Sequence, residues 1–213
     1  MTQPDVHEIM VVRIVDDDEE LLTSFRFLLE GEGWFVRIYN SAESFLEKDN
    51  FNVPGCAIVD IRMNGMNGLE LQDTLNARGI KLPLIFLSGH GTIEDVVDTL
   101  QSGAVTFLSK PASLEKLREA ISKAMDCASE INEQKSDIRN WHSLTGKEKE
   151  VARLVSQGLL NKQIAGELGI AERTVQTHRT MVYRKLDAKN NIGVCKQFCV
   201  LSDLTIFLCL ESS

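Results

Sequence analysis

Five acidic, hydroxyl or basic side chains stand at the carboxyl ends of short apolar runs in the first half of the sequence. They are Asp16, Asp17, Asp60, Ser88 and Lys110. Three carboxylates brought close together repel one another and need a compensating cation. Oxygen ligands of this kind, with room for water, suit Mg²⁺. An aspartate held by such a cation can attack phosphorus and form an acyl phosphate, while a lysine neutralises the charge on the transferring oxygens.

The elements that must bring these side chains together follow from the apolar runs themselves. The runs cover residues 10–15, 35–38, 56–60, 84–88 and 105–109. Helix-like amphipathic segments lie between them, the fourth around Val96, Val97 and Leu100. This alternation indicates right-handed crossover units around a buried parallel sheet. We therefore predict an α/β doubly wound domain of five strands and five helices, with the site at the carboxyl edge of the sheet.

Each of these five residues, taken singly, is most simply explained as an ordinary polar residue at the end of a strand. Their joint occurrence at four strand ends favours the functional interpretation, because chance rarely supplies the required chemistry at every position. The sequence therefore predicts a phosphoacceptor site.

Residues 8–126 resemble the response-regulator receiver domain, which has a flavodoxin-like fold. The motifs that carry the resemblance are IVDDDE, VDIRMNGMNG, LSGHG and SKP. The resemblance implies that Asp60 is phosphorylated and that Asp17, Asp60 and the backbone carbonyl of Arg62 bind Mg²⁺ directly, with Asp16 acting through water. It further implies that Ser88, Lys110 and Phe107 are the catalytic and switch residues, with Phe107 rotating inward when Ser88 is drawn to the phosphoryl group.

Asn64 and Asp18 lie close to these motifs but are not among the site residues. Asn64 stands where the family usually has proline, a departure that loosens the loop after Asp60 but removes no ligand. Asp18 is one position beyond the acidic pair, and we interpret it as a solvated residue. The resemblance also makes Lys110–Pro111 a peptide bond that is commonly cis in this family.

A helix predicted to begin after Ser113, its N-cap, continues beyond the first domain. Its apolar positions recur at alternating steps of four and three residues, with one polar interruption: Leu117, Ile121, Ala124, Ala128, Ile131, Lys135 and Ile138. This period is typical of a coiled coil, so the helix is either a dimer-forming helix or a plain exposed linker. We divide the chain into a receiver domain at 8–126, a helical linker at 127–142 and a C-terminal domain at 143–213.

From Ser143 onward the pattern predicts helices only. Thr145 and Glu148 form a T-x-x-E capping box, and Gly158 ends that helix. Asn161 is predicted to cap the next helix, Gly169 to make a tight turn, and a third helix to run from about residue 172 to 186. The domain is therefore predicted to be all-α.

Residues 141–200 resemble the LuxR-type helix-turn-helix of the NarL/FixJ family. The third helix would read base edges in the major groove through Gln176, Thr177 and Thr180. Contacts to phosphates are expected from Lys162, Arg173, Thr174, His178, Arg179, Arg184 and Lys185. Ala171 stands where the family often has a capping Ser or Thr, which costs about 1 kcal/mol of local stability. The alternative is a solvated basic helix face without function.

Charge and composition agree with two dissimilar domains. The net charge is −8; acidic residues predominate before residue 113, and basic residues predominate after residue 140. This asymmetry suggests a cation-binding half and a polyanion-binding half. No run is long enough to span a membrane, no secretory leader is expected, and the five cysteines, which form no C-x-x-C pair, are expected to be reduced thiols in the cytoplasm.

We therefore expect a two-component regulator, not an enzyme. Its partners would be a cognate histidine kinase, double-stranded promoter DNA, a second copy of the chain on activation, and RNA polymerase. One rival is a dehalogenase-like phosphatase, which needs an acid two residues after the nucleophile, where Arg62 stands. A second rival is an unphosphorylated receiver that only dimerises, and the complete set of five site residues argues against it.

Overall fold

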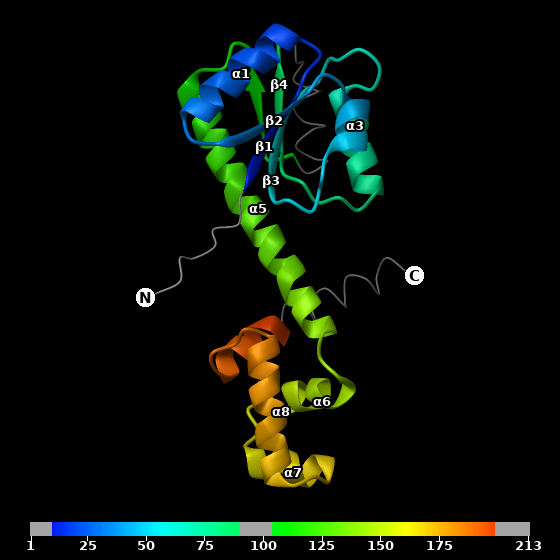
Figure 1. Cartoon of the computed structure of the whole chain (residues 1–213), viewed down its shortest axis with the longest axis vertical. Helices are drawn as coiled ribbons and strands as arrows, with labels where there is room; N and C mark the ends of the chain where they lie inside the picture. Colours follow the sequence, from blue (N-terminus) through cyan, green and yellow to red (C-terminus); the bar gives the residue numbers. More distant parts are fainter. Residues whose placement is uncertain (1–9, 90–103, 199–213) are drawn as a thin grey trace. The chain divides into compact units, whose positions relative to one another are not determined.

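The computed structural model describes residues 10–89 and 104–198. The chain forms two compact units, Met1–Asn132 and Glu133–Ser213 (Figure 1). Among the described helices, none combines the length and the apolar character that a membrane crossing requires.

The N-terminal unit is built on a five-stranded parallel sheet. Its strands are β1 (Val11–Val15), β2 (Phe35–Tyr39), β3 (Gly55–Asp60), β4 (Leu84–Ser88) and β5 (Thr106–Ser109). They lie side by side in the order β2-β1-β3-β4-β5. All four strand pairs are parallel, in register along their lengths. The predicted doubly wound sheet is therefore confirmed, and the five strands coincide with the five apolar runs to within about one residue.

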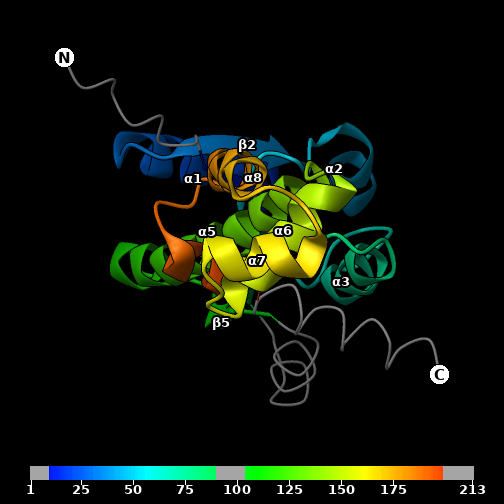
Figure 2. The ribbon, with the colours of Figure 1, turned by 90° about the horizontal axis from the view of Figure 1, so that it is seen from below.

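Helices cover both faces of this sheet. They are α1 (Glu19–Gly31), α2 (Ala42–Lys48), α3 (Gly68–Ala77) and α5 (Leu114–His142). One apolar cluster joins α1 and α5 to one face, and a second joins α2 and α3 to the other (Figure 2). The strands are apolar on both faces because both faces are covered. The predicted helix around Val96, Val97 and Leu100 lies outside the described residues.

Helix α5 begins as predicted, but its apolar stripe is used differently. The Ser113 hydroxyl accepts a hydrogen bond from the Lys116 backbone N–H at 3.4 Å, which confirms the N-cap. The first four stripe positions, Leu117, Ile121, Ala124 and Ala128, are buried, and the first three belong to the apolar cluster on the sheet. A coiled-coil seam over these positions is therefore excluded, because their side chains are already buried within the N-terminal unit. Three positions of the stripe lie beyond this buried stretch: Ile131, Lys135 and Ile138.

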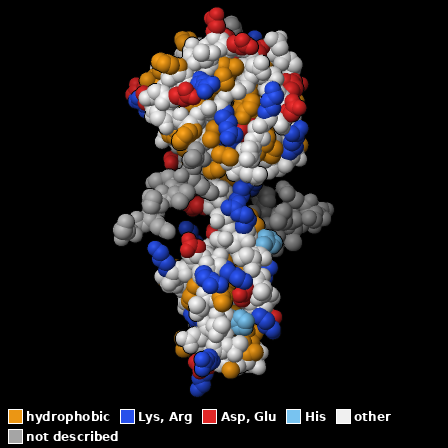
Figure 3. Space-filling model, viewed as in Figure 1, with side chains coloured by type: hydrophobic (Ala, Val, Ile, Leu, Met, Phe, Trp, Pro, Cys, Tyr) orange, Lys and Arg blue, Asp and Glu red, His pale blue; other side chains and the backbone are white. Residues whose placement is uncertain are grey.

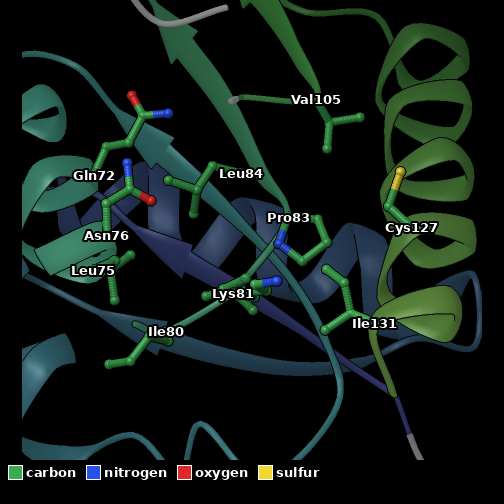
Figure 4. Close-up of a pocket in the computed structure, with 11 residues that line it drawn as sticks. Gln72, Leu75, Asn76, Ile80, Lys81, Pro83, Leu84, Val105, Cys127 and Ile131 are labelled. Carbon is green, nitrogen blue, oxygen red and sulfur yellow. The ribbon is translucent and has the colours of Figure 1, made fainter. Parts of the chain in front are cut away.

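Ile131 lines a pocket of about 270 Å³ between α3 and α5. Figure 4 shows Ile131 and Cys127 on one side, Leu75 and Asn76 on the other, and Leu84 between them. Because Leu84 begins β4 and Ser88 ends it, this pocket lies at the opposite edge of the sheet from the predicted site.

The C-terminal unit is helical throughout its described part. It contains α6 (Gly146–Ser156), α7 (Asn161–Leu168) and α8 (Glu172–Lys185), and residues 191–198 are also helical. The buried side chains that form its core come from all four segments: Leu144, Val151, Leu154, Val155, Ile164, Val175, Val182, Leu186 and Val194. The predicted all-α fold is confirmed. Residues 199–213 at the end of the chain lie outside the described part of the structure.

The helix ends in this unit test the capping predictions. The box of Thr145 and Glu148 is present, and Gly158 follows α6 at φ +83°. Gly169 makes the turn after α7 at φ +65°, in the left-handed region that favours glycine. The prediction for Asn161 is wrong: Leu160 is the N-cap, and its backbone N–H is satisfied by the Gln163 side chain at 2.8 Å. Ala171 caps α8 without a side-chain hydrogen bond, as predicted.

Three of the cysteines, Cys56, Cys127 and Cys195, are free thiols, as expected for a reduced chain. Burial raises the pKa of Cys56 to about 12, so this thiol is an inert part of the core. Cys199 and Cys209 lie outside the described residues.

A fully buried arginine inside the sheet was not foreseen from the sequence. Arg13 lies in β1, and its Nε donates to Asp49 Oδ2 at 2.6 Å, while one Nη donates to the Val53 carbonyl at 2.7 Å. Asp49, just after α2, also accepts from the Tyr39 hydroxyl at 2.6 Å. Burial, together with the Asp49 carboxylate, raises the pKa of Tyr39 to about 12, so this hydroxyl remains a donor. The network ties the α2–β3 connection to the first two strands.

Asp49→Ala is expected to destabilise the N-terminal unit by about 3–5 kcal/mol, because it leaves the Arg13 guanidinium buried without its partner. Urea unfolding monitored by circular dichroism measures this loss. The matched control is Glu119→Ala, which breaks an exposed ion pair with Lys123 and should leave the stability nearly unchanged, because solvent screens such pairs. Equal effects in the two variants would contradict the assignment.

A second ion pair fixes α6 to the end of α8. Lys185 Nζ donates to Glu148 Oε2 at 2.7 Å and to the Ser143 carbonyl at 3.1 Å. The hydrogen bond from Lys185, and then that from the Thr145 backbone N–H, lower the pKa of Glu148 to about 2. A lowered carboxyl pKa stabilises the fold above the ordinary value of 4.5, and this contribution is lost as the pH falls towards 2.

Glu148→Gln should therefore destabilise the C-terminal unit at about pH 6, and the difference from the native chain should shrink by about pH 3. Glutamine keeps the capping box, so the charge alone is removed. The measurement is denaturant unfolding followed by Trp141 fluorescence in a Trp34→Phe background, since the chain has two tryptophans. A difference that stayed constant with pH would contradict the role of the charge.

Candidate functional site

The fold brings the predicted acidic residues and the lysine together at the carboxyl edge of the sheet. Asp16 follows β1, and Asp60 is the last residue of the adjacent strand β3. Lys110, directly after β5, reaches across β4, and its Nζ donates to Asp16 Oδ2 and to Asp60 Oδ2, both at 2.7 Å. One ammonium group thus bridges two carboxylates that would otherwise repel each other.

Asp17 completes a cluster of three carboxylates. Asp16, Asp17 and Asp60 each offer one oxygen, and these oxygens lie within 4.8 Å of one another. Asp16 and Asp60 are buried and Asp17 is half-buried, so the cluster opens towards solvent on one side. A set of hard oxygen donors with an open side fits Mg²⁺, which keeps several of its waters. Arg62, whose carbonyl was predicted as a ligand, donates its backbone N–H to Asp60 Oδ1 at 3.2 Å.

The electrostatics of the cluster follow from burial and from the lysine. Burial raises the pKa of Asp16, and the hydrogen bond from Lys110 opposes that rise without cancelling it. Burial by itself would lower the pKa of Lys110, but its hydrogen bonds to Asp16 and Asp60 outweigh this effect and raise it. Lys110 is therefore a permanent cation at the site.

Ser88 and Phe107 lie on the two strands next to the acidic cluster. Ser88 ends β4, is buried, and accepts the Lys110 backbone N–H on its carbonyl at 2.8 Å. Phe107 lies on β5 beside Phe86 of β4 and packs, half-buried, on the second apolar cluster. The Lys110–Pro111 peptide bond is cis.

Three side chains beside the cluster have roles that the sequence did not reveal. Asp18 is exposed, as expected, but it is also the N-cap of α1, accepting from the backbone N–H groups of Glu20 and Leu21. Asn64 donates to Asp17 from both its backbone and its side chain. Glu43 of α2 accepts the Met66 backbone N–H at 2.8 Å, and this contact lowers the pKa of Glu43. An aspartate directly before two glutamates and a helical pattern could have suggested the Asp18 cap; the other two contacts join distant segments.

In the C-terminal unit, α8 presents the predicted base-reading residues to solvent. Gln176, Thr177 and Thr180 are exposed. The two threonine hydroxyls donate to backbone carbonyls one turn earlier in α8, at 3.1 and 3.0 Å. Gln176 and Thr180, with Lys162 of α7, line an open groove of about 580 Å³ between α7 and α8.

The predicted phosphate-contacting residues fall into two groups. Lys162, Arg173, Thr174 and Arg184 are exposed, and His178 is half-buried. Lys and Arg side chains are spread over the face of the C-terminal unit that Figure 3 shows. A surface of this kind attracts polyanions without reading sequence.

Arg179 and Lys185 form the second group, because their charged heads have partners inside the domain. Arg179 donates to Asn161 Oδ1, the Tyr183 hydroxyl and Asn191 Oδ1, each at 2.7 Å. Tyr183 also donates to Asn191. Lys185 is paired with Glu148. The structure thus favours a role for both cations in joining helices, which differs from the phosphate contacts predicted from the sequence.

Comparison with known families accounts for both units. Residues 12–122 match the family described as "Response regulator receiver domain". Residues 142–196 match "Bacterial regulatory proteins, luxR family".

Individual relatives share this two-domain organisation in sequence and structure. The chain is 38% identical over 180 residues to response regulator protein TodT of Pseudomonas putida, covering 83% of this chain and 79% of that protein. It is 33% identical over 187 residues to the tetrathionate response regulatory protein TtrR of Salmonella typhimurium, covering 88% and 91%. The solved structure of response regulator StyR matches with a TM-score of 0.69 at 37% identity, over 88% of this chain and 97% of that one.

These matches agree with the acidic cluster and its bridging lysine in the first unit, and with the helical fold and exposed α8 in the second. The chain is a regulator rather than an enzyme, and it belongs to the two-component response regulators of the NarL/FixJ family, with a receiver domain followed by a LuxR-type helix-turn-helix domain.

Proposed function

We propose that phosphorylation of Asp60 by a cognate histidine kinase controls how this protein binds promoter DNA. The observation that carries the proposal is the position of Lys110 Nζ, 2.7 Å from both Asp16 and Asp60. This places a fixed cation where negative charge would develop on a phosphoryl group attached to Asp60.

In the proposed reaction, an Asp60 carboxylate oxygen forms a bond to phosphorus while the bond between phosphorus and the kinase's histidine nitrogen breaks. The electron pair of that bond remains on the imidazole. Asp17, Asp60 and the Arg62 carbonyl would hold Mg²⁺, with Asp16 acting through water, and the ion would supply charge neutralisation for the transferring oxygens. Lys110 donates to the phosphoryl group, and Ser88 provides a hydroxyl from the neighbouring strand end.

The signal would then pass along β4 and β5. A phosphoryl group adds charge and strong hydrogen-bond acceptors, so it draws Ser88 and Lys110 towards itself. Phe107, one strand away from Ser88 and half-buried, is placed to move into the space that is left. The phosphoryl group thereby biases an existing equilibrium towards an active state. We propose that this state is a homodimer that binds a two-fold promoter site in the cytoplasm and activates transcription with RNA polymerase.

On DNA, α8 would enter the major groove with Gln176, Thr177 and Thr180 towards the base edges. We assign the phosphate contacts to the exposed Lys162, Arg173, Thr174 and Arg184, with His178 at the edge of this surface. Arg179 and Lys185 would instead hold α8 against its neighbouring helices.

Asp60→Asn tests the acceptor. Native protein treated with acetyl phosphate or beryllofluoride and Mg²⁺ should gain DNA affinity and change its oligomeric state, because the acyl phosphate or its analogue shifts the switch. The variant has an amide in place of the acceptor carboxylate and should not respond. Duplex binding by fluorescence anisotropy and mass by light scattering measure the two effects. An equal response of both proteins would eliminate Asp60 as the acceptor.

Arg173→Gln and Arg179→Gln together test the division of the basic residues. The logarithm of the affinity falls with the logarithm of the salt concentration, and loss of one phosphate contact reduces the magnitude of this slope by about 0.9. We expect this decrease for Arg173→Gln, with a duplex selected from a random pool. Arg179→Gln should weaken binding and leave the slope unchanged, because its charge serves Asn161, Tyr183 and Asn191. A slope of smaller magnitude for Arg179→Gln would show that Arg179 contacts phosphate.

A further inference from the structure

One oxygen of the acidic cluster is already occupied by groups of the protein. Asp17 Oδ2 accepts two hydrogen bonds from Asn64, one from its backbone N–H at 3.0 Å and one from its side-chain Nδ2 at 2.6 Å. Asp17 is also one of the three carboxylates that can hold a cation. The carboxylate of the cluster that is most open to solvent is therefore shared between a cation and Asn64.

The loop after β3 is built so that it keeps Asn64 in this position. Gly68 N–H donates to the Ile61 carbonyl at 2.9 Å, which closes the loop at its base. Glu43 accepts the Met66 N–H, and its carboxylate lies 2.8 Å from where a Cβ on Gly65 would stand. Gly65 also has φ +78°, so a larger residue there would be strained as well as crowded. The loop is held at both ends, with Asn64 between them.

Both contacts depend on the residue type at position 64. Alanine would keep only the backbone donor, and proline, which has no backbone N–H and no side-chain donor, would make neither hydrogen bond to Asp17. Asn64 thus contributes two donors to the cation site.

We propose that Asn64 is a positioning residue that competes with the divalent cation for Asp17 and so sets the cation concentration at which the receiver can be phosphorylated. The inference rests on the proposed function, in which Asp17 is a cation ligand and phosphorylation of Asp60 depends on that cation. The two hydrogen bonds use the lone pairs of Asp17 Oδ2, so a cation that binds Asp17 through this oxygen must release or rearrange them. Hydrogen bonds to a charged group are among the stronger ones in proteins, so their loss opposes metal binding.

The test is a titration of the full-length chain with Mn²⁺, whose free ion is measured by electron paramagnetic resonance, followed by competition with Mg²⁺. Asn64→Ala removes the side-chain donor and should tighten Mn²⁺ binding by about three- to tenfold. Asn64→Pro removes both donors and should tighten it at least as much. The matched control is Asn52→Ala, an exposed asparagine in the connection before β3 at the other edge of the sheet, which should bind Mn²⁺ as the native chain does.

Unchanged or weaker Mn²⁺ binding by Asn64→Ala would overturn the inference, because Asn64 would then support the metal site or be indifferent to it. The failure of the proposed function has a different signature: native protein would bind Mn²⁺ and yet remain unmodified by acetyl phosphate. Melting temperatures without metal show that each variant is folded. If Asn64→Pro unfolds, Asn64→Ala decides the matter by itself.

Discussion

Electrostatic repulsion among carboxylates is the constraint on which the receiver site depends. Asp16 directly follows β1 and Asp60 ends the neighbouring β3, so the parallel sheet forces their charges to the same edge. Lys110, which comes from 50 residues further along the chain than Asp60, offsets part of that repulsion through two short hydrogen bonds. The remaining negative charge makes the site receptive to a divalent cation and to chemistry at Asp60. The same charge would be costly anywhere else in the core.

The rest of the N-terminal unit allows this edge to remain charged and open. Two apolar clusters, one on each face of the sheet, supply the burial that stabilises the domain. Towards the other edge, the Arg13–Asp49 network joins β1 and β2 to the α2–β3 connection without involving the acidic cluster. Stability and site chemistry are thus separated along the strands, as is usual for open α/β sheets.

In the C-terminal unit the cations serve two purposes. Arg179 and Lys185 use their charge within the domain, where Arg179 links α7, α8 and the helix at 191–198 and Lys185 links α8 to α6. Arg173 and Arg184 are exposed on α8. The internal cations thus fix α8 against its neighbouring helices, whereas the exposed ones face solvent.

The sequence by itself determined the elements and the chemistry of the site. Apolar runs and helical periodicity depend on residues close in the chain, so they predicted five strands, the helix-turn-helix and the strand ends that carry Asp16, Asp60, Ser88 and Lys110. Only the tertiary structure decided which partners the charged side chains find. Arg13 and Asp49 are 36 residues apart, Asp17 and Asn64 are 47 apart, and Glu148 and Lys185 are 37 apart. Local patterns carry no information about such partners. For the same reason the apolar period of α5 is typical of a coiled coil, although its first four positions are buried within the N-terminal unit.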